Sequence, residues 1–392
     1  MEQAKAPKLR FRQDDGTEFP IWESITLETE GNFYNGLSGK TKDDFDHGDA
    51  KFIPYIAVYN GTFLNDEILK PVDVHSNERQ NKIHNGDLLF TQSSETLEEV
   101  GMAAVWMSPS TPYLNSFCFG FRLNKQSHIS PEFMGHLMRS PYARRLISTQ
   151  GQGISRFNIS ASRLGKIHFM RPAAKEQKKI ANFFTAFDCR IALADKKLAT
   201  LQTIKKGMLQ KIFSQELRFK NDDGNEFPAW KKCKMKDILT LCHGKDYKHL
   251  GDGDYPVIGT SGIFAHVDGY MCDWPCAMIG RKGATLDRPH YMDTPFWCVD
   301  TLFYTKPHKN HDPKFQYYLF HTIDWMKYNE TSGMPSLRAS TIDQIQIAVP
   351  CFKEQQKISA YFTAIDRSIA AAQKKAAALR TIKKGLLQKM FI

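Results

Sequence analysis

The sequence predicts an α+β protein with two mixed domains joined by two long helices. Three observations predict this fold: two blocks of sequence occur twice, the segments between them share almost no identity, and a heptad pattern follows each of two prolines. Residues 9–22, LRFRQDDGTEFPIW, recur at 217–230 as LRFKNDDGNEFPAW, a shift of 208 positions. Residues 203–213, TIKKGMLQKIF, recur at 381–391 as TIKKGLLQKMF, a shift of 178. A chain that repeats its connecting segments and varies the segments between them is expected to hold two different domains at a fixed distance and orientation.

The composition is that of a globular protein. A length of 392 residues accommodates two domains of ~150 residues and connecting helices, and the apolar fraction of 42% and charged fraction of 24% are ordinary. No apolar run reaches the ~18 residues of a membrane span, and the start lacks the apolar segment of a signal peptide. We therefore expect a cytoplasmic protein with no membrane partner.

The eight cysteines are irregularly spaced and lie mostly in apolar surroundings, so we expect reduced core residues. Cys272 and Cys276 form the only close pair, and His266 and His290 lie nearby in sequence. A zinc site there would need a second close pair of ligands, which the sequence lacks. No metal site is predicted.

Both connecting segments, which follow Pro172 and Pro350, have the periodicity of long helices. Apolar residues are spaced by four and then three positions, as in a coiled coil. Two matched helices in one chain most simply pair with each other, and the alternative is that each packs on its own domain. The helix rises about 48 Å from Ile180 to Ile212 at ~1.5 Å per residue. The predicted seam consists of Ile180, Phe184, Phe187, Ile191, Leu198 and Leu201 in the first helix, and Ile358, Phe362, Ile365, Ile369, Leu379 and Leu386 in the second.

Two polar or flexible positions recur inside the helices. Lysine occupies one seam position in both copies, at 205 and 383, and a glycine follows two residues later, at 207 and 385. Glycine inside a helix costs ~1 kcal/mol relative to alanine, so its recurrence predicts a bend or a close contact.

The positive charge is concentrated in the connecting segments. The net charge is +11, and residues 172–215 carry nine basic residues against three acidic ones, while residues 350–392 carry nine against two. A basic excess favours a polyanionic partner, but a lysine-rich, solvated helix face would give the same count.

The two variable bodies, residues 23–170 and 231–349, are predicted to be rich in sheet. Each has short β-branched and aromatic runs, at 52–61, 86–94, 101–109 and 116–124 in the first and at 255–264, 276–286 and 296–306 in the second. A helix is expected near 131–149 and near 313–328. A faint parallel between the runs indicates one fold with divergent surfaces.

No catalytic residue is predicted. The sequence lacks the Asn/Asp-Pro-Pro motif and the glycine-rich cofactor loop of an amino-methyltransferase, and it has no phosphate-binding loop. Glu176-Gln177-Lys178 resembles half of a nuclease metal site, but it lies at a helix start without a carboxylate pair upstream. These absences favour binding over catalysis.

Polar and basic loop residues in both bodies are the candidates for DNA binding. Arginine can read guanine and Asn or Gln can read adenine, while Ser and Lys hold phosphate. For each residue singly, a solvated loop or a turn cap is the simpler interpretation, so the prediction depends on their collective placement. The candidates are Gln92, Ser93, Ser94, Gln152, Ser155, Arg156, Asn158, Arg281, Lys282, Ser336 and Arg338.

The repeated blocks resemble those of the specificity subunit of type I restriction-modification systems. The resemblance rests on IKKGMLQKIF followed by SQELRFKNDDGNEFPAW, on IKKGLLQKMF at the C-terminus, and on the Pro-x-x-x-Glu-Gln-x-x-Ile openings at Pro172 and Pro350. It covers essentially the whole chain. It implies target recognition domains at 9–171 and 216–349, and conserved helical regions at 172–215 and 350–392 that form an antiparallel coiled coil.

The resemblance also implies the partners and the chemistry. Double-stranded DNA is read at an asymmetric bipartite site, two methyltransferase subunits dock on the chain, and endonuclease/translocase subunits join them. S-adenosylmethionine, ATP and Mg²⁺ are expected on those partners and no cofactor in this chain. The repeats further indicate a chain arranged as a circle opened at one join, with approximate two-fold symmetry and neighbouring termini. A self-contained methyltransferase or restriction enzyme and a structural coiled-coil adaptor are the alternatives.

Overall fold

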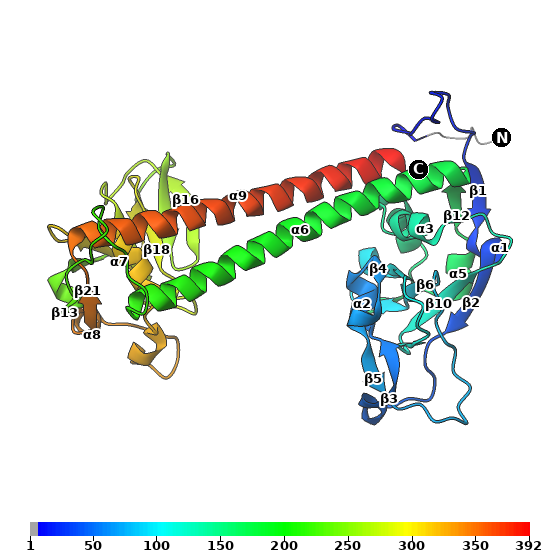
Figure 1. Cartoon of the computed structure of the whole chain (residues 1–392), viewed down its shortest axis with the longest axis horizontal. Helices are drawn as coiled ribbons and strands as arrows, with labels where there is room; N and C mark the ends of the chain where they lie inside the picture. The colour runs from blue at the N-terminus through cyan, green and yellow to red at the C-terminus, as the bar shows by residue number, and fades with distance from the viewer. Residues whose placement is uncertain (1–6) are drawn as a thin grey trace. The chain divides into compact units, whose positions relative to one another are not determined.

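Two long helices dominate the computed structural model, which describes residues 7–392 (Figure 1). They are α6 (Ala174–Phe213) and α9 (Phe352–Met390). Unit 1 contains the chain up to Ala194 together with Lys375–Ile392, and unit 2 contains Asp195–Lys374. The predicted boundaries at 172, 216 and 350 bracket the two helices, whereas the two compact units each include a part of both.

Unit 1 is built on a five-stranded sheet of order β2-β10-β6-β8-β4. Neighbouring strands are antiparallel except β4 and β8, which are parallel. A three-stranded sheet of order β5-β3-β9 is formed by strands that alternate along the chain with those of the central sheet, and β1 pairs with β12 to join the two ends of the body. The strands are β1 (Glu23–Thr26), β2 (Gly31–Asn35), β3 (Phe45–Ile53), β4 (Phe63–Leu64), β5 (Lys70–Val72), β6 (Leu88–Thr91), β7 (Ser93–Ser94), β8 (Ala103–Trp106), β9 (Tyr113–Leu114), β10 (Cys118–Leu123), β11 (Phe157–Asn158) and β12 (His168–Arg171).

Unit 2 repeats this plan with one difference, because its central sheet has four strands and no counterpart of the parallel edge strand β4. Its central sheet has the order β14-β20-β17-β18, a three-stranded sheet has the order β16-β15-β19, and β13 pairs with β21 across the ends of the body. In both three-stranded sheets one pair is parallel, β3 with β9 and β15 with β19. The prediction of one fold for both bodies is therefore confirmed. The strands are β13 (Lys231–Lys234), β14 (Leu239–His243), β15 (Tyr255–Gly259), β16 (Gly262–Val267), β17 (Cys276–Gly280), β18 (His290–Met292), β19 (Trp297–Cys298), β20 (Leu302–Pro307) and β21 (Gln346–Val349).

The short helices correct three sequence-based expectations. Residues 52–61 are not one strand, because β3 ends at Ile53 and Pro54 caps α2 (Tyr55–Asn60). The helix expected at 131–149 is two, α3 (Pro131–Met138) and α4 (Pro141–Ser148), because Ser140 caps a new helix. The helix expected at 313–328 ends at Phe320, and a 3₁₀ turn follows. The remaining helices are α1 (Leu27–Glu30), α5 (Ala161–Gly165), α7 (Pro313–Phe320) and α8 (Ala339–Asp343), with 3₁₀ turns at Lys42–Asp44, Asp66–Ile68, Leu97–Glu99, Met235–Asp237 and Trp325–Tyr328.

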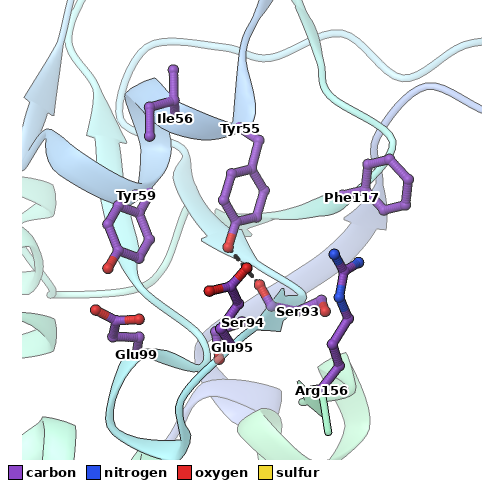
Figure 2. Close-up of a pocket in the computed structure, with 9 residues that line it drawn as sticks. All are labelled: Tyr55, Ile56, Tyr59, Ser93, Ser94, Glu95, Glu99, Phe117 and Arg156. Carbon is purple, nitrogen blue, oxygen red and sulfur yellow. Dashed lines mark hydrogen bonds between the residues drawn. The ribbon is translucent and has the colours of Figure 1, made fainter. Parts of the chain in front are cut away.

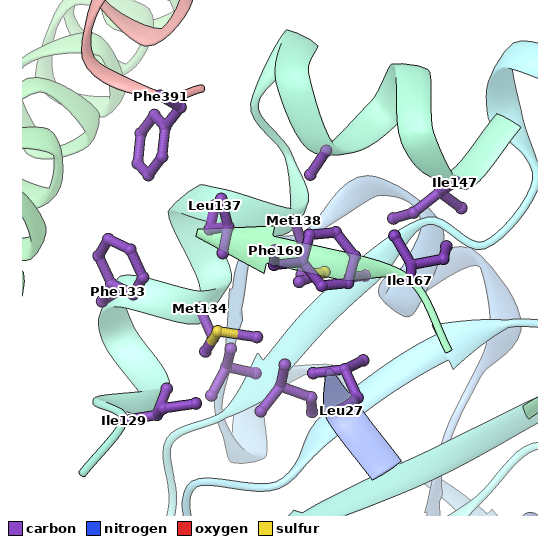
Figure 3. Close-up of a cluster of buried hydrophobic side chains, with 14 of the residues drawn as sticks. Leu27, Ile129, Phe133, Met134, Leu137, Met138, Ile147, Ile167, Phe169 and Phe391 are labelled. Carbon is purple, nitrogen blue, oxygen red and sulfur yellow. The ribbon is translucent and has the colours of Figure 1, made fainter. Parts of the chain in front are cut away.

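The repeated helix ends complete the main core of each unit. In unit 1, the ring of Phe391, the residue after α9, lies 5.8 Å from that of Phe133 (Figure 3). It also lies 5.8 Å from the ring of Phe184. In unit 2, Phe213 at the end of α6 lies 5.4 Å from Phe315 and 6.0 Å from Trp230. The recurrence of the KKGxLQKxF block thus has a packing reason, because each copy fills the same place in one unit.

The repeated Glu-Gln pair at each helix start is buried and hydrogen-bonded. Glu176 accepts from Arg10 Nε (3.1 Å), Arg10 Nη2 (2.8 Å) and Trp22 Nε1 (3.1 Å). Gln177 accepts from the Ser130 backbone N–H (2.8 Å) and donates to the Pro172 carbonyl (2.9 Å). These contacts tie the N-terminal block, the body and the helix of unit 1 together.

Unit 2 contains the matching set. Glu354 accepts from Arg218 Nε (3.2 Å) and Nη2 (2.7 Å). Gln355 accepts from the Asp312 N–H (2.9 Å) and donates to the Pro350 carbonyl (2.9 Å). One difference is Trp230, whose indole N–H is buried without a hydrogen-bond partner among the described residues, whereas Trp22 has one.

The helices pair in antiparallel fashion within each unit, which confirms the coiled coil. All twelve predicted seam residues are buried or half-buried. In unit 1, Lys383 of α9 forms an ion pair with Asp188 of α6. In unit 2, Lys205 of α6 pairs with Asp366 of α9 at 2.6 Å. The seam lysines therefore meet carboxylates from the opposite helix, which the heptad pattern did not reveal.

The glycines at 207 and 385 make no close contact. A Cβ atom added at either position would meet no atom within 4 Å, and both helices continue through the glycine. The expectation of a close contact is wrong, and the structure gives no account of why glycine recurs there.

Within residues 7–392, no helix is long and apolar enough to span a membrane, and no group of three or more His, Cys, Asp or Glu side chains could hold a metal ion. The Cys272 and Cys276 sulfurs lie 4.0 Å apart in a buried apolar cluster.

Acid should destabilise unit 1 through one buried histidine, His136. Burial and the nearby Lys383 lower the pKa of His136 to about 3. The unfolded chain binds this proton near pH ~6.5, so the stability is present above that pH and is lost as the pH falls toward the folded value. We expect a loss of about 1.4 kcal/mol per pH unit from His136.

Urea unfolding at several pH values between 7.5 and 5 measures this loss. In His136→Phe, the acid dependence of unfolding should be weaker, because phenylalanine binds no proton while it keeps the aromatic contact with Phe63. An unchanged pH dependence in this variant would contradict the assignment to His136.

The two ends of the described chain meet as the circular arrangement predicts. The Leu9 N–H donates to the Lys389 carbonyl (3.0 Å) in unit 1, and the Leu217 N–H donates to the Lys211 carbonyl (3.0 Å) in unit 2. These two bonds join equivalent positions of the repeats. Unit 2 contains an unbroken connection where unit 1 contains the chain ends.

A circular permutant should therefore fold. It would begin at Leu217, join Phe391 to Leu9 through Ser-Gln-Glu, the connector that follows Phe213, and end at Phe213. We expect its melting temperature to stay within a few degrees of the parent, because every buried contact named above is preserved. A second permutant opened at Ala181, which is buried inside α6, is the control and should lose the structure of unit 1. Equal melting of the two permutants would contradict the circular arrangement.

Candidate nucleic-acid interface

In unit 1 the structure brings together the DNA-binding candidates that the sequence predicted in two segments, residues 92–94 and 152–158. β7 pairs with β11, which places Ser93 opposite Asn158, and an isolated bridge joins Asn158 to Gln152. Ser155 and Arg156 lie in the loop that this bridge closes. Of this set only Ser94 is buried, with Ser93 half-buried, so the polar atoms of Gln92, Gln152, Ser155, Arg156 and Asn158 face outward.

A pocket of about 400 Å³ opens beside this strand pair (Figure 2). It combines residues of α2, of the segment after β6, and of two loops. Sequence reasoning identified three of its residues, Ser93, Ser94 and Arg156. It missed the other six, which are Tyr55, Ile56, Tyr59, Glu95, Glu99 and Phe117. The four-residue spacing of Tyr55 and Tyr59 would have indicated one helix face, but their segment was interpreted as a strand.

The tyrosines of the pocket are fixed by hydrogen bonds at its floor. Tyr55 donates its hydroxyl proton to the Ser93 carbonyl, and burial raises the pKa of Tyr55. The hydrogen bond with Glu99 raises the pKa of Tyr59. The two rings lie 6.2 Å apart and nearly parallel, at 19°. Both phenols therefore stay neutral at physiological pH, and their rings form a firm apolar wall.

Unit 2 brings its predicted residues together in the corresponding place. An isolated bridge joins Lys282 to Ser336, and the Leu337 N–H donates to the Arg281 carbonyl (2.8 Å). Ser336 precedes α8 as Asn158 precedes α5, at the shift of 178 found for the helices. The segment after β17 thus meets the segment before α8, as the segment after β6 meets the segment before α5.

The charges differ between the two places. Lys282 forms an ion pair with Asp300 (2.9 Å), and Arg338 pairs with Glu330 (2.7 Å). Gly283 follows with φ +123°, in the region that favours glycine, so the backbone turns sharply next to these cations. Unit 2 therefore presents cations paired with carboxylates, whereas unit 1 presents a pocket that combines aromatic side chains with Glu95, Glu99 and Arg156. Both sets of donors, acceptors and apolar groups suit contacts with base edges in a groove.

Comparison with known proteins identifies the family. The model of the type I restriction modification DNA specificity domain matches residues 22–203 and 229–381. The chain belongs to this family. The specificity domain occurs twice in it, in agreement with the repeated plan of the two units.

The similarity to curated relatives covers nearly the whole chain in one case and about half of it in another. The type I restriction enzyme MjaVIII specificity subunit of Methanocaldococcus jannaschii is 24% identical over 416 residues, covering 96% of this chain and 94% of that protein. The StySPI specificity subunit of Salmonella potsdam is 26% identical over 187 residues, covering 47% and 39%.

The fold of the specificity family is also found in solved structures. The crystal structure of the type I restriction-modification S subunit from M. genitalium superposes with a TM-score of 0.64 at 16% identity, covering 99% of each chain. A chain from a structure describing complex assembly and conformational transition of the type I system gives 0.56 at 16% identity, covering 95% and 98%. At these identities the likeness establishes the fold.

Proposed function

We propose that this chain is the DNA-reading subunit of a type I restriction-modification complex and recognises an asymmetric bipartite site. One observation carries the proposal. Units of similar topology bring outward-facing polar residues together at corresponding places, residues 92–94 with 152–158 in one and 281–282 with 336–338 in the other. Because the side chains at these places differ, each unit reads a different half of the site.

The chemistry is proposed to reside on partner subunits. Two methyltransferase subunits would hold S-adenosylmethionine, and endonuclease/translocase subunits would hold ATP and Mg²⁺. An exposed ion pair that occurs at the same place in both units supports two binding sites for one kind of partner. In unit 1 the side chain of Asp14 is 94% exposed and pairs with Lys179, and in unit 2 Asp222 is 94% exposed and pairs with Lys357. Two copies of one partner would meet the same charges in each unit.

Mapping modified adenines tests the function. The chain is expressed together with the methyltransferase subunits of its system, and the modified positions in the host genome are determined with and without it. We expect modified adenines at one bipartite sequence only when the chain is present. Methylation of DNA by the purified chain alone would instead favour a self-contained enzyme, and modification without sequence preference would favour a structural adaptor.

Arg156 is predicted to read a base in the first half-site. Arg156→Ala should weaken binding to the recognised duplex by about 1–3 kcal/mol and relax the preference at one base pair, because arginine donates to guanine or thymine acceptors in the major groove. Fluorescence anisotropy with duplexes altered at each position measures this. Arg163→Ala, an exposed arginine in α5 outside the pocket, is the matched control. Equal weakening on all duplexes would mean that Arg156 contacts phosphate.

A further inference from the structure

We infer that the pocket of unit 1 receives the 5-methyl group of a thymine, presented at the major-groove edge of an A·T pair. The inference rests on the proposed DNA-reading function and deepens it by naming what the first unit recognises. It follows from three properties of the pocket: its exposed apolar rim, its carboxylates, and its guanidinium.

The rim exposes large apolar side chains to solvent. Ile56 is 57% exposed on α2, and Phe117 is 65% exposed on the loop before β10. The loop that carries Arg156 also holds Ile154, which is 98% exposed. Ile56 and Phe117 enclose an apolar hollow together with the rings of Tyr55 and Tyr59. Figure 2 shows these four side chains around it. Single exposed apolar residues are ordinary, but a concave group of them indicates a surface that is covered when the protein binds its ligand.

The carboxylates exclude phosphate as the group that enters. Glu95 and Glu99 line the same pocket. Their negative charges repel the DNA backbone, so the pocket meets base edges instead. A carboxylate accepts hydrogen bonds from an exocyclic amino group, which adenine carries at N6 and cytosine at N4.

The combination of groups matches an A·T pair. In the major groove this pair presents the adenine amino group, the thymine O4 acceptor and the thymine methyl group side by side. Glu95 can accept from the amino group, Arg156 can donate to O4, and the apolar hollow can hold the methyl. A G·C pair has no apolar group in the major groove, so it would leave the hollow unfilled.

Uracil substitution tests the inference on the DNA and leaves the protein intact. The full chain, assembled with its methyltransferase subunits, is bound to its recognised duplex, in which each thymine in turn is replaced by uracil. We expect at least one replacement in the first half-site to weaken binding about fourfold, the value of one buried methyl group. In Ile56→Ala and in Phe117→Ala, thymine and uracil duplexes should bind equally well at that position.

A matched control variant and three contrary outcomes distinguish failure of the thymine inference from failure of the proposed DNA-reading function. Ile263→Ala removes an apolar residue of unit 2 that is 51% exposed, and it should leave the thymine preference of the first half-site unchanged. If uracil is tolerated at every position while base-pair changes still abolish binding, DNA reading stands and the inference is overturned. A first half-site without any A·T pair overturns it as well. If no duplex is preferred over any other, both the inference and the proposed function fail.

Discussion

Replacement of Glu176 by alanine should destabilise unit 1 by about 3–5 kcal/mol. The Glu176 side chain is 0% exposed, and its carboxylate is the acceptor for the Arg10 guanidinium and the Trp22 indole. Removing the carboxylate leaves the cation, which is 16% exposed, without its counter-charge and the indole N–H without an acceptor. The N-terminal block should then detach from the start of α6.

Hydrogen exchange followed by mass spectrometry measures this loss for each unit separately, since a single unfolding transition cannot be assumed for a two-unit chain. Exchange should rise in peptides of unit 1 and stay unchanged in unit 2. Glu354→Ala should give the reverse, because Glu354 pairs with Arg218 in the same way.

Two controls define what the buried pair contributes. Asp14→Asn removes only an exposed partner of Lys179 and should change exchange little. Arg10→Met combined with Glu176→Leu should recover part of the stability that Glu176→Ala loses, because burying two apolar side chains avoids the desolvation of two charges. Unchanged exchange in Glu176→Ala would show that the repeated block is not held by this pair.

Exchange of the first body should change one half of the recognised site and leave the other half intact. Replacing residues 23–170 with the same segment of a relative replaces the whole candidate surface of unit 1, while the helices and unit 2 keep their sequence. Preference for the original first half-site should fall by about 10³-fold or more, the usual ratio of specific to non-specific binding. Mapping of modified adenines, or selection from random duplexes, measures it.

The structure improves the design of this exchange. β1 and β12 pair with Glu23 opposite Arg171, and Arg171 also forms ion pairs with Glu23 and Glu30. The donor segment should therefore carry its own residue at position 171, so that the pair is exchanged as a unit. The reciprocal exchange of residues 231–349 is the control and should change only the second half-site. A change of both halves in either chimaera would contradict independent reading by the two units.

The repeated parts were predictable because their constraints are local and periodic. The seam of α6 and α9 follows from a heptad spacing, and all twelve predicted residues are buried or half-buried. The short elements of the bodies were less predictable. Tyr55–Asn60 carries β-branched and aromatic residues, yet it is helical. Pro54 ends the preceding strand, and side chains of the helix pack against β6 and β8. The pocket was missed for the same reason. The rings of Tyr55 and Tyr59 lie 6.2 Å apart because their segment is a helix, whereas in a strand residues four apart would be separated by about 13 Å.

The sequence by itself determined the duplication, the two helices, the family resemblance and the division into constant and variable parts. These are properties of periodicity and identity along the chain. Only the tertiary structure decided that Lys205 and Lys383 meet Asp366 and Asp188, that Glu176 and Glu354 are buried, and that a pocket opens beside Arg156. The physical reason is that these features join residues 39 to 195 positions apart, and no local propensity fixes which distant side chains will share one buried place.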